Sequence, residues 1–159
     1  MQKTLIINNL EFAQNQLKLI ESFDVGLLAR LAETLSTSDK TAVNFELIGN
    51  SKRFRQPSLQ LHIKANLPVI CQRCLNKMTV NLALNFNYLV CDADKDAPAD
   101  DDEIDWLESN HEMNLLELIE DELLLAMPIA PTHAEACNKT SMQSGEKPNP
   151  FAALKGLIK

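Results

Sequence analysis

The sequence predicts an α+β fold in one domain: an antiparallel meander sheet, either open or curled toward a barrel, with two packed helices. Three segments in the middle of the chain alternate apolar and polar residues, as half-buried strands do. Two other segments repeat apolar residues at helical spacing. The 159 residues, 45% of them hydrophobic and 23% charged, suffice for a single hydrophobic core.

Near the N-terminus, residues 11–24 leave two interpretations open. Their first half, EFAQNQ, suits a short helix, whereas the following LKLIESF alternates well enough for a strand. Residues 25–36 then place their leucines on one helical face, which predicts a helix there. Asp24 is a suitable N-cap, because its carboxylate can accept from the free amides of a first helical turn.

The three alternating segments are 42–49, 58–67 and 79–90. Each places apolar side chains on one face and polar side chains on the other, which predicts strands with one face against the core. Short connections between consecutive strands favour antiparallel pairing. The basic residues 51–56 form the predicted hairpin loop between the first two strands.

The acidic charge is concentrated in one segment. Residues 92–122 contain 14 acidic residues and one basic residue, although the whole chain has a net charge of only −7. Residues 92–112 are predicted to be an acidic loop, because like charges repel and little apolar surface is available. Within this loop, EIDW could return as a short edge strand.

Residues 115–127 give the clearest helix. Asn114 is the expected N-cap with Glu117 at the third helical position, and prolines at 128 and 131 end the helix. The predicted buried stripe consists of Leu115, Leu118, Ile119 and Leu123.

The domain is predicted to span residues 1–137, followed by a flexible tail at 138–159 whose apolar end, FAALKGLIK, suits a short amphipathic helix. No stretch approaches the roughly 18 apolar residues that a membrane span needs. The N-terminal apolar run, Leu5–Ile7, is too short for the core of a signal peptide. We therefore expect a cytoplasmic protein that does not insert into membranes.

The four cysteines suggest one candidate metal site. Cys71 and Cys74 form a C-x-x-C motif at a strand end, where a tight turn can direct both sulfurs to one ion. His133 and Cys137 would complete a Cys3His set suited to structural zinc. A tight turn with two semi-buried thiols, or a redox-active motif, are the alternatives, and Cys91 is predicted to be a lone thiol at a strand end.

No catalytic constellation is visible. The carboxylates Glu117, Glu120, Asp121 and Glu122 could serve in acid/base chemistry, but three of the four lie on the polar side of an amphipathic helix and fit a solvated face. No nucleophile, base and metal are grouped together in the sequence. We therefore predict a protein that is not an enzyme.

A second constellation is basic. Lysines and arginines grip phosphates, and one aromatic ring can stack on a base, so a basic cluster around a phenylalanine is a candidate RNA-binding surface. A hairpin tip that only keeps the protein soluble is the alternative. The candidate RNA-binding residues are Lys52, Arg53, Phe54, Arg55, Arg73 and Lys77.

Three strings in order resemble the large ribosomal RNA subunit accumulation family, the bacterial YceD proteins. The first is ICQRCL at 70–75, with the family's C-x-R-C motif. The second is IEDELLLAMPIAPTH at 119–133, and the third is KPNPFAALKGLIK at 147–159. The residues that match family motifs are Cys71, Arg73, Cys74, Glu120, Asp121, Glu122, Asn149, Pro150 and Phe151.

This resemblance implies a role in the synthesis, processing or stability of 23S ribosomal RNA and implies no catalytic activity. Precursor or mature 23S rRNA would be bound directly, or the chain would bind a ribosomal protein or an RNA-processing enzyme. A protein–protein interaction module without RNA contact is the alternative. Some relatives carry further cysteines that would complete a metal site, whereas this chain offers His133 and Cys137.

Overall fold

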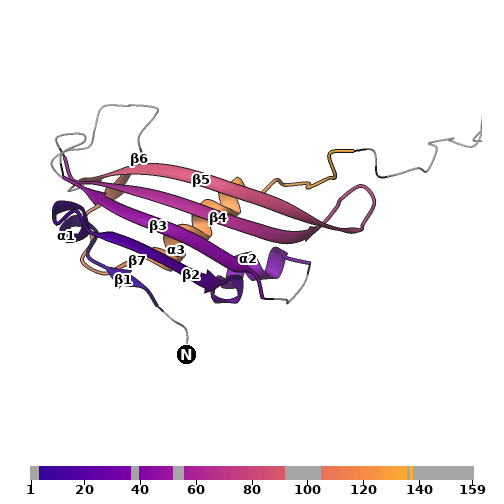
Figure 1. Cartoon of the computed structure of the whole chain (residues 1–159), viewed down its shortest axis with the longest axis horizontal. Coiled ribbons are helices and arrows are strands. Elements are labelled where there is room, and N and C mark those ends of the chain that lie inside the picture. The colour runs from indigo at the N-terminus through magenta and orange to yellow at the C-terminus, as the bar shows by residue number, and fades with distance from the viewer. Residues whose placement is uncertain (1–3, 37–39, 52–55, 92–104, 136, 138–159) are drawn as a thin grey trace, which may run out of the picture.

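The computed structural model describes residues 4–36, 40–51, 56–91, 105–135 and 137. Five strands form the main sheet, two short strands form a second sheet, and three α-helices and one 3-10 helix complete the fold (Figure 1). The elements are β1 (Ile6–Ile7), α1 (Asn9–Gln14), β2 (Lys18–Asp24), η1 (Val25–Leu27), α2 (Ala29–Thr34), β3 (Ala42–Asn50), β4 (Ser58–Ile70), β5 (Lys77–Cys91), β6 (Asp105–Glu108), β7 (Met113–Asn114) and α3 (Leu115–Ala126).

The main sheet has the order β2-β3-β4-β5-β6, so the first four strands form the predicted antiparallel meander. Pairing is longest between β4 and β5, from Ser58 opposite Leu89 to Ile70 opposite Lys77. EIDW does return to the sheet edge, but β6 runs parallel to β5. The sheet is therefore mostly antiparallel, as predicted, with one parallel pair at this edge.

The sheet stays open, so the curling toward a barrel that the sequence also allowed is wrong. Strands β2 and β6 are its two edges and do not pair with each other. In Figure 1, α3 crosses behind the sheet, while the face toward the viewer carries no helix. Alternate strand residues such as Val43, Leu61 and Ile63 are fully buried against the helices.

Residues 11–24 contain both predicted elements, a short helix followed by a strand. EFAQNQ contributes to the short helix α1, and LKLIESF becomes β2. The predicted helix at 25–36 is divided into η1 and α2, because Leu28 between them has a non-helical backbone, with φ −101° and ψ 89°. Asp24 does cap η1, since its side chain accepts a hydrogen bond from the amide of Gly26 at 2.8 Å.

The N-terminal segment is tied to the chain before α3. Strand β1 pairs with β7 in the small second sheet. Asn9 is almost fully buried there, and its side chain bonds both to the carbonyl of Glu108 and to the amide of Asn110. These bonds satisfy buried backbone groups at a turn that would otherwise lose contact with water.

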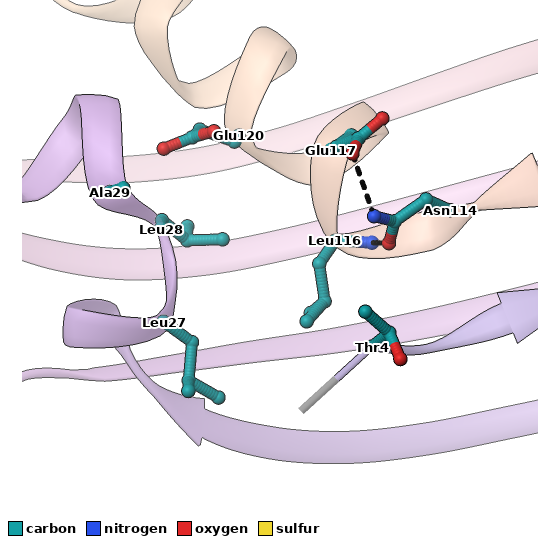
Figure 2. Close-up of a pocket in the computed structure, with 8 residues that line it drawn as sticks. All are labelled: Thr4, Leu27, Leu28, Ala29, Asn114, Leu116, Glu117 and Glu120. Atoms are coloured by element: carbon teal, nitrogen blue, oxygen red, sulfur yellow. Dashed lines mark hydrogen bonds between the residues drawn. The ribbon is translucent and has the colours of Figure 1, made fainter. Parts of the chain in front are cut away.

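Helix α3 begins as predicted. The side-chain oxygen of Asn114 accepts from the amide of Leu116, and its side-chain amide donates to Glu117 at 2.9 Å (Figure 2). The helix ends before Pro128, and Leu115, Ile119 and Leu123 are fully buried as expected. A cavity of 180 Å³ lies between this helix start, Thr4 and residues 27–29.

Of the four carboxylates of α3, Glu120 is the one that does not belong to a solvated face, since it is only 6% exposed. One of its oxygens accepts hydrogen bonds from the amides of Arg30 and Leu31, and the other pairs with the Arg30 guanidinium at 2.8 Å. The free amides at the start of α2 thus receive an acceptor from another helix, which the helix-start residue Leu28 cannot supply. Figure 2 shows Glu120 directed toward this start of α2.

The neighbouring acids also make structural contacts. Asp121 pairs with the guanidinium of Arg30, and Glu122 accepts a hydrogen bond from the hydroxyl of Tyr88 at 2.7 Å. Burial and the adjacent Glu122 raise the pKa of Tyr88, so the hydroxyl keeps its proton and acts as the donor. These bonds fix α3 to α2 on one side and to β5 on the other.

We predict that Glu120→Ala lowers the free energy of unfolding by about 2–3 kcal/mol, because it leaves buried amides without an acceptor. Most of the loss should come from these amides, since the Arg30 side chain is 55% exposed and its ion pair is screened by water. Urea denaturation measures the change. The control is Glu33→Ala, an exposed position on α2, where a change within about 0.5 kcal/mol is expected; equal losses for both variants would contradict the assignment.

Candidate metal centre

Three cysteines and one histidine meet where the β4–β5 hairpin contacts the chain that follows α3. Cys71 and Cys74 lie in the turn between the two strands, and His133 and Cys137 come from the chain after the helix. One candidate ligand atom from each residue lies within 4.8 Å of all the others. The predicted Cys3His set is thus brought together, with Cys71 buried and the other three partly exposed.

The spacing of these atoms suits a tetrahedral ion. The sulfurs of Cys71 and Cys137 are 3.7 Å apart, and the Cys74 sulfur lies 3.5 Å from Nδ1 of His133. A tetrahedral ion with metal–sulfur bonds of about 2.3 Å and metal–nitrogen bonds of about 2.0 Å separates two sulfurs by about 3.8 Å, and sulfur from nitrogen by about 3.5 Å. Both pairs therefore stand close to the edge lengths of a zinc-sized tetrahedron.

The turn that carries the C-x-x-C motif is held by its own backbone. The amide of Leu75 donates to the carbonyl of Cys71 at 2.9 Å, and the amide of Cys71 donates to the carbonyl of Asn76 at 2.9 Å. Leu75 has a positive φ of 59°, a conformation that costs a non-glycine residue about 1 kcal/mol. The tight turn returns the chain to β5 directly after both sulfurs have been presented on one side.

Arg73 holds the other half of the cluster in place. Its guanidinium donates to the carbonyls of His133 and Glu135, each at 2.7 Å, and its Nε donates to the sulfur of Cys137 at 3.1 Å. The amide of Gln72 donates to the carbonyl of Pro131. The segment after α3 that carries His133 and Cys137 is therefore fixed by Gln72 and Arg73, the residues between the two hairpin cysteines. The sequence analysis did not predict this role for Arg73.

The surroundings of Cys71 favour its thiolate form. Burial opposes the charge, but hydrogen bonds from the backbone amides of Cys74, His133 and Arg73 outweigh it and lower the pKa of Cys71 to about 5. A thiolate is the form of cysteine that binds metal ions.

The pKa values of Cys74, His133 and Cys137 depend on one another. Burial opposes ionisation of Cys137, but hydrogen bonds from His133 and Arg73 lower its pKa, and the sulfurs of Cys137 and Cys71 raise the pKa of His133. Cys74 behaves differently: a backbone hydrogen bond from Asn76 favours its thiolate, yet burial and the two neighbouring sulfurs raise its pKa. Three sulfurs this close cannot all be negative at low cost unless a cation lies among them.

This donor set fits a closed structural site. Three thiolates and one imidazole are ligands that soft or borderline ions such as Zn²⁺ prefer, and four protein ligands leave no open position for a substrate. The redox alternative lacks its usual setting, since C-x-x-C lies here in a turn between antiparallel strands and not at a helix start. Cys91 ends β5, where its sulfur lies 3.7 Å from the side-chain oxygen of Gln56, outside the cluster.

The basic candidate residues are only partly placed. Positions 52–55, which hold Lys52, Arg53, Phe54 and Arg55, lie outside the described residues, as do Asn149, Pro150 and Phe151. Lys77 is exposed at the start of β5. The direct RNA contacts expected of these residues and of Arg73 stay predictions.

Comparison with known proteins relates the chain to one described family. The sequence model of one family, described as large ribosomal RNA subunit accumulation protein YceD, matches residues 59–158. A relative from Haemophilus influenzae, also described as large ribosomal RNA subunit accumulation protein YceD, is 28% identical over 174 residues, covering 99% of this chain and 98% of the relative. No solved structure is significantly similar to the chain.

We predict that the reduced protein binds one Co²⁺ per chain in a tetrahedral thiolate site, because the four ligand atoms are already close together. Titration should give visible bands of tetrahedral Co²⁺ and a thiolate-to-cobalt charge-transfer band. Cys74→Ser and Cys137→Ser should weaken both, whereas Cys91→Ala should leave them unchanged. Bands of equal strength in Cys137→Ser would show that Cys137 is not a ligand.

Proposed function

The chain belongs to the YceD family of large ribosomal RNA subunit accumulation proteins, and from this membership we propose that it is a cytoplasmic factor in the synthesis, processing or stability of 23S rRNA. The main support for this proposal is the family match over residues 59–158. This match includes every residue of the metal cluster. The Haemophilus influenzae relative aligns over nearly the full length of both chains, which supports the same role for the whole protein.

The protein acts without catalysis in this proposal. In the described part of the chain, the carboxylates most suggestive of acid/base chemistry have structural partners. Glu120 caps α2, Asp121 pairs with Arg30, and Glu122 holds the hydroxyl of Tyr88. These contacts support a binding or assembly role for the family motif that contains them.

The cluster of Cys71, Cys74, His133 and Cys137 holds a structural zinc ion in this proposal. Such an ion joins the β4–β5 hairpin to the chain after α3, segments about 60 residues apart in sequence. A closed four-ligand site stabilises a fold by restricting the unfolded chain and by releasing binding free energy on folding. Zinc would thus fix the geometry of the hairpin end without taking part in a reaction.

The chain acts by binding precursor rRNA directly or by binding an assembly partner. One observation favours the second route as an alternative function: an apolar groove of 440 Å³ lies beside the metal centre, lined by residues of α2, β4 and the chain after α3. Leu125 and Ile129 nearby are 82% and 104% exposed. Exposed apolar groups around a groove are typical of protein-binding sites.

None of the helices in the described ranges has the length and apolar character that crossing a membrane would require. This finding is compatible with the proposed work on ribosomal RNA in the cytoplasm.

We predict that depleting the protein lowers the ratio of mature 23S to 16S rRNA severalfold, measured by electrophoresis of total RNA and by sequencing of precursor ends. The wild-type gene should restore the ratio, and so should Cys91→Ala. Cys74→Ser should restore it poorly, because losing one ligand weakens zinc binding and the hairpin end with it. Zinc content of the purified variants, measured by native mass spectrometry, checks the cause.

An unchanged 23S to 16S ratio after complete depletion would overturn the proposed function. Full rescue by a Cys74→Ser protein that carries no zinc would leave the rRNA role intact and overturn the proposed importance of the ion.

A further inference from the structure

The helix-free face of the main sheet is unusual in its side chains. Register pairs place Asn44 opposite Lys64, Asn66 opposite Asn81, His62 opposite Asn85 and Gln60 opposite Asn87. Side chains of register partners stand on the same side of a sheet, so these residues share one surface. This surface, here called the amide face, consists of Asn44, Gln60, Asn66, Asn81, Asn85 and Asn87.

The amide face is ordered by side-chain hydrogen bonds between β4 and β5. The amide of Gln60 donates to the oxygen of Asn87 at 2.9 Å, and a ring nitrogen of His62 bonds to the oxygen of Asn85. The amide groups of Asn85 and Asn87 therefore keep their own N–H donors for a ligand. A hollow of 360 Å³ lined by Asn44, Lys64, Asn66 and Asn81 indents the same face.

Asparagine is a poor strand former, so propensity alone does not account for three asparagines at alternate positions of β5. Asn81, Asn85 and Asn87 stand where threonine or valine would favour the strand more. Their shared chemistry is a flat group that both donates and accepts hydrogen bonds. That chemistry suits a partner which presents donors and acceptors in a fixed array.

The charge in the middle of this face is positive although the protein is acidic. Lys64 lies there, next to His62 on β4, and Lys77 lies on the same face at its hairpin end, opposite Ile70. The one acid there, Glu46, is paired with Lys18, and that hydrogen bond, together with the charges of Lys18, His62 and Lys64, lowers the pKa of Glu46.

The other acids of this face lie on its two edge strands. Asp24 on β2 is engaged with the amide of Gly26, and Glu108 ends β6. The acids of α3 lie on the opposite side of the sheet, where the helix packs. A negatively charged partner would therefore meet Lys64 and amides in the middle of the face, Lys77 at its hairpin end, and few carboxylates.

The chemistry of the amide face indicates whether it suits unpaired RNA or double-helical RNA. Unpaired RNA is held mainly by stacking on aromatic rings, and Trp106 on edge strand β6, 49% exposed, is the one tryptophan of the chain. Double-helical RNA instead offers a wide, shallow minor groove rich in 2′-hydroxyl groups, which both donate and accept hydrogen bonds. A flat face of amides with flanking lysines matches the second form.

We propose that the amide face binds double-helical RNA, with the asparagine and glutamine side chains contacting 2′-hydroxyl groups and base edges and with Lys64 and Lys77 contacting phosphates. This inference rests on the proposed function and names the RNA form and the surface for it. Binding depends on RNA shape more than on sequence, because amides on a flat sheet read the minor groove.

The test is binding of the zinc-loaded full chain to a fluorescent RNA duplex of mixed sequence, about 16 base pairs long. Competitors are the same sequence as a DNA duplex and as a single RNA strand. We expect the RNA duplex to bind about tenfold or more tightly than either competitor. Replacing Lys64 and Lys77 with Gln should reduce the slope of log affinity against log salt by about two, one for each lost phosphate contact.

The main variant is Asn81→Asp with Asn85→Asp. An aspartate keeps the oxygen that bonds to His62 but replaces N–H donors with negative charge, so affinity should fall about tenfold or more. The matched control is Gln14→Glu with Asn15→Asp, which adds the same charge at two exposed positions, the last residue of α1 and its C-cap, outside the amide face, and its affinity should change less than about threefold. Thermal unfolding shows that each variant is folded.

Equal binding of DNA and RNA duplexes, or equal affinity of the main and control variants, would overturn the proposal. So would loss of 23S rescue by the main variant when purified wild-type protein binds no RNA, because the face would then serve a protein partner. If depletion lowers 23S rRNA while no duplex binding occurs, the proposed function stands and this inference fails.

Discussion

The long pairing of β4 with β5 is the constraint on which the rest of the structure depends. Its register sets which side chains face the helices and which face solvent, because a shift by one residue would exchange the two faces. The same register places the C-x-x-C turn at the far end of the hairpin. The core, the amide face and the first two metal ligands therefore share one geometric origin.

Helix α3 positions the chain that follows it relative to the sheet. Buried Glu120 fixes it to the start of α2, and Glu122 fixes it to Tyr88 on β5. The chain that leaves the helix is consequently directed along the sheet toward the hairpin turn, where Arg73 and Gln72 bind its carbonyls. The two halves of the metal cluster meet because both ends of this path are anchored.

The two sides of the sheet differ in chemistry: one side contributes to the core of the fold, and the other is the side proposed to bind RNA. The helix side combines the apolar core with the acids of α3, several of which have structural partners. The opposite side is polar, amide-rich and positive in its middle. A net charge of −7 therefore describes neither side, and charge segregation allows an acidic protein to offer a surface to a polyanion.

The sequence by itself determined the elements governed by short-range rules: the three long strands, helix α3 with its Asn114 cap, and the Cys3His set. Period-two and helical spacing, capping chemistry and ligand type are local properties of the chain. Only the tertiary structure decided the parallel edge strand, the open sheet, the burial of Glu120 and the contacts of Arg73 with the chain after α3. The partners in these contacts are 17 to 90 positions apart in the sequence, and no local pattern specifies which distant group will satisfy a buried charge or a free amide.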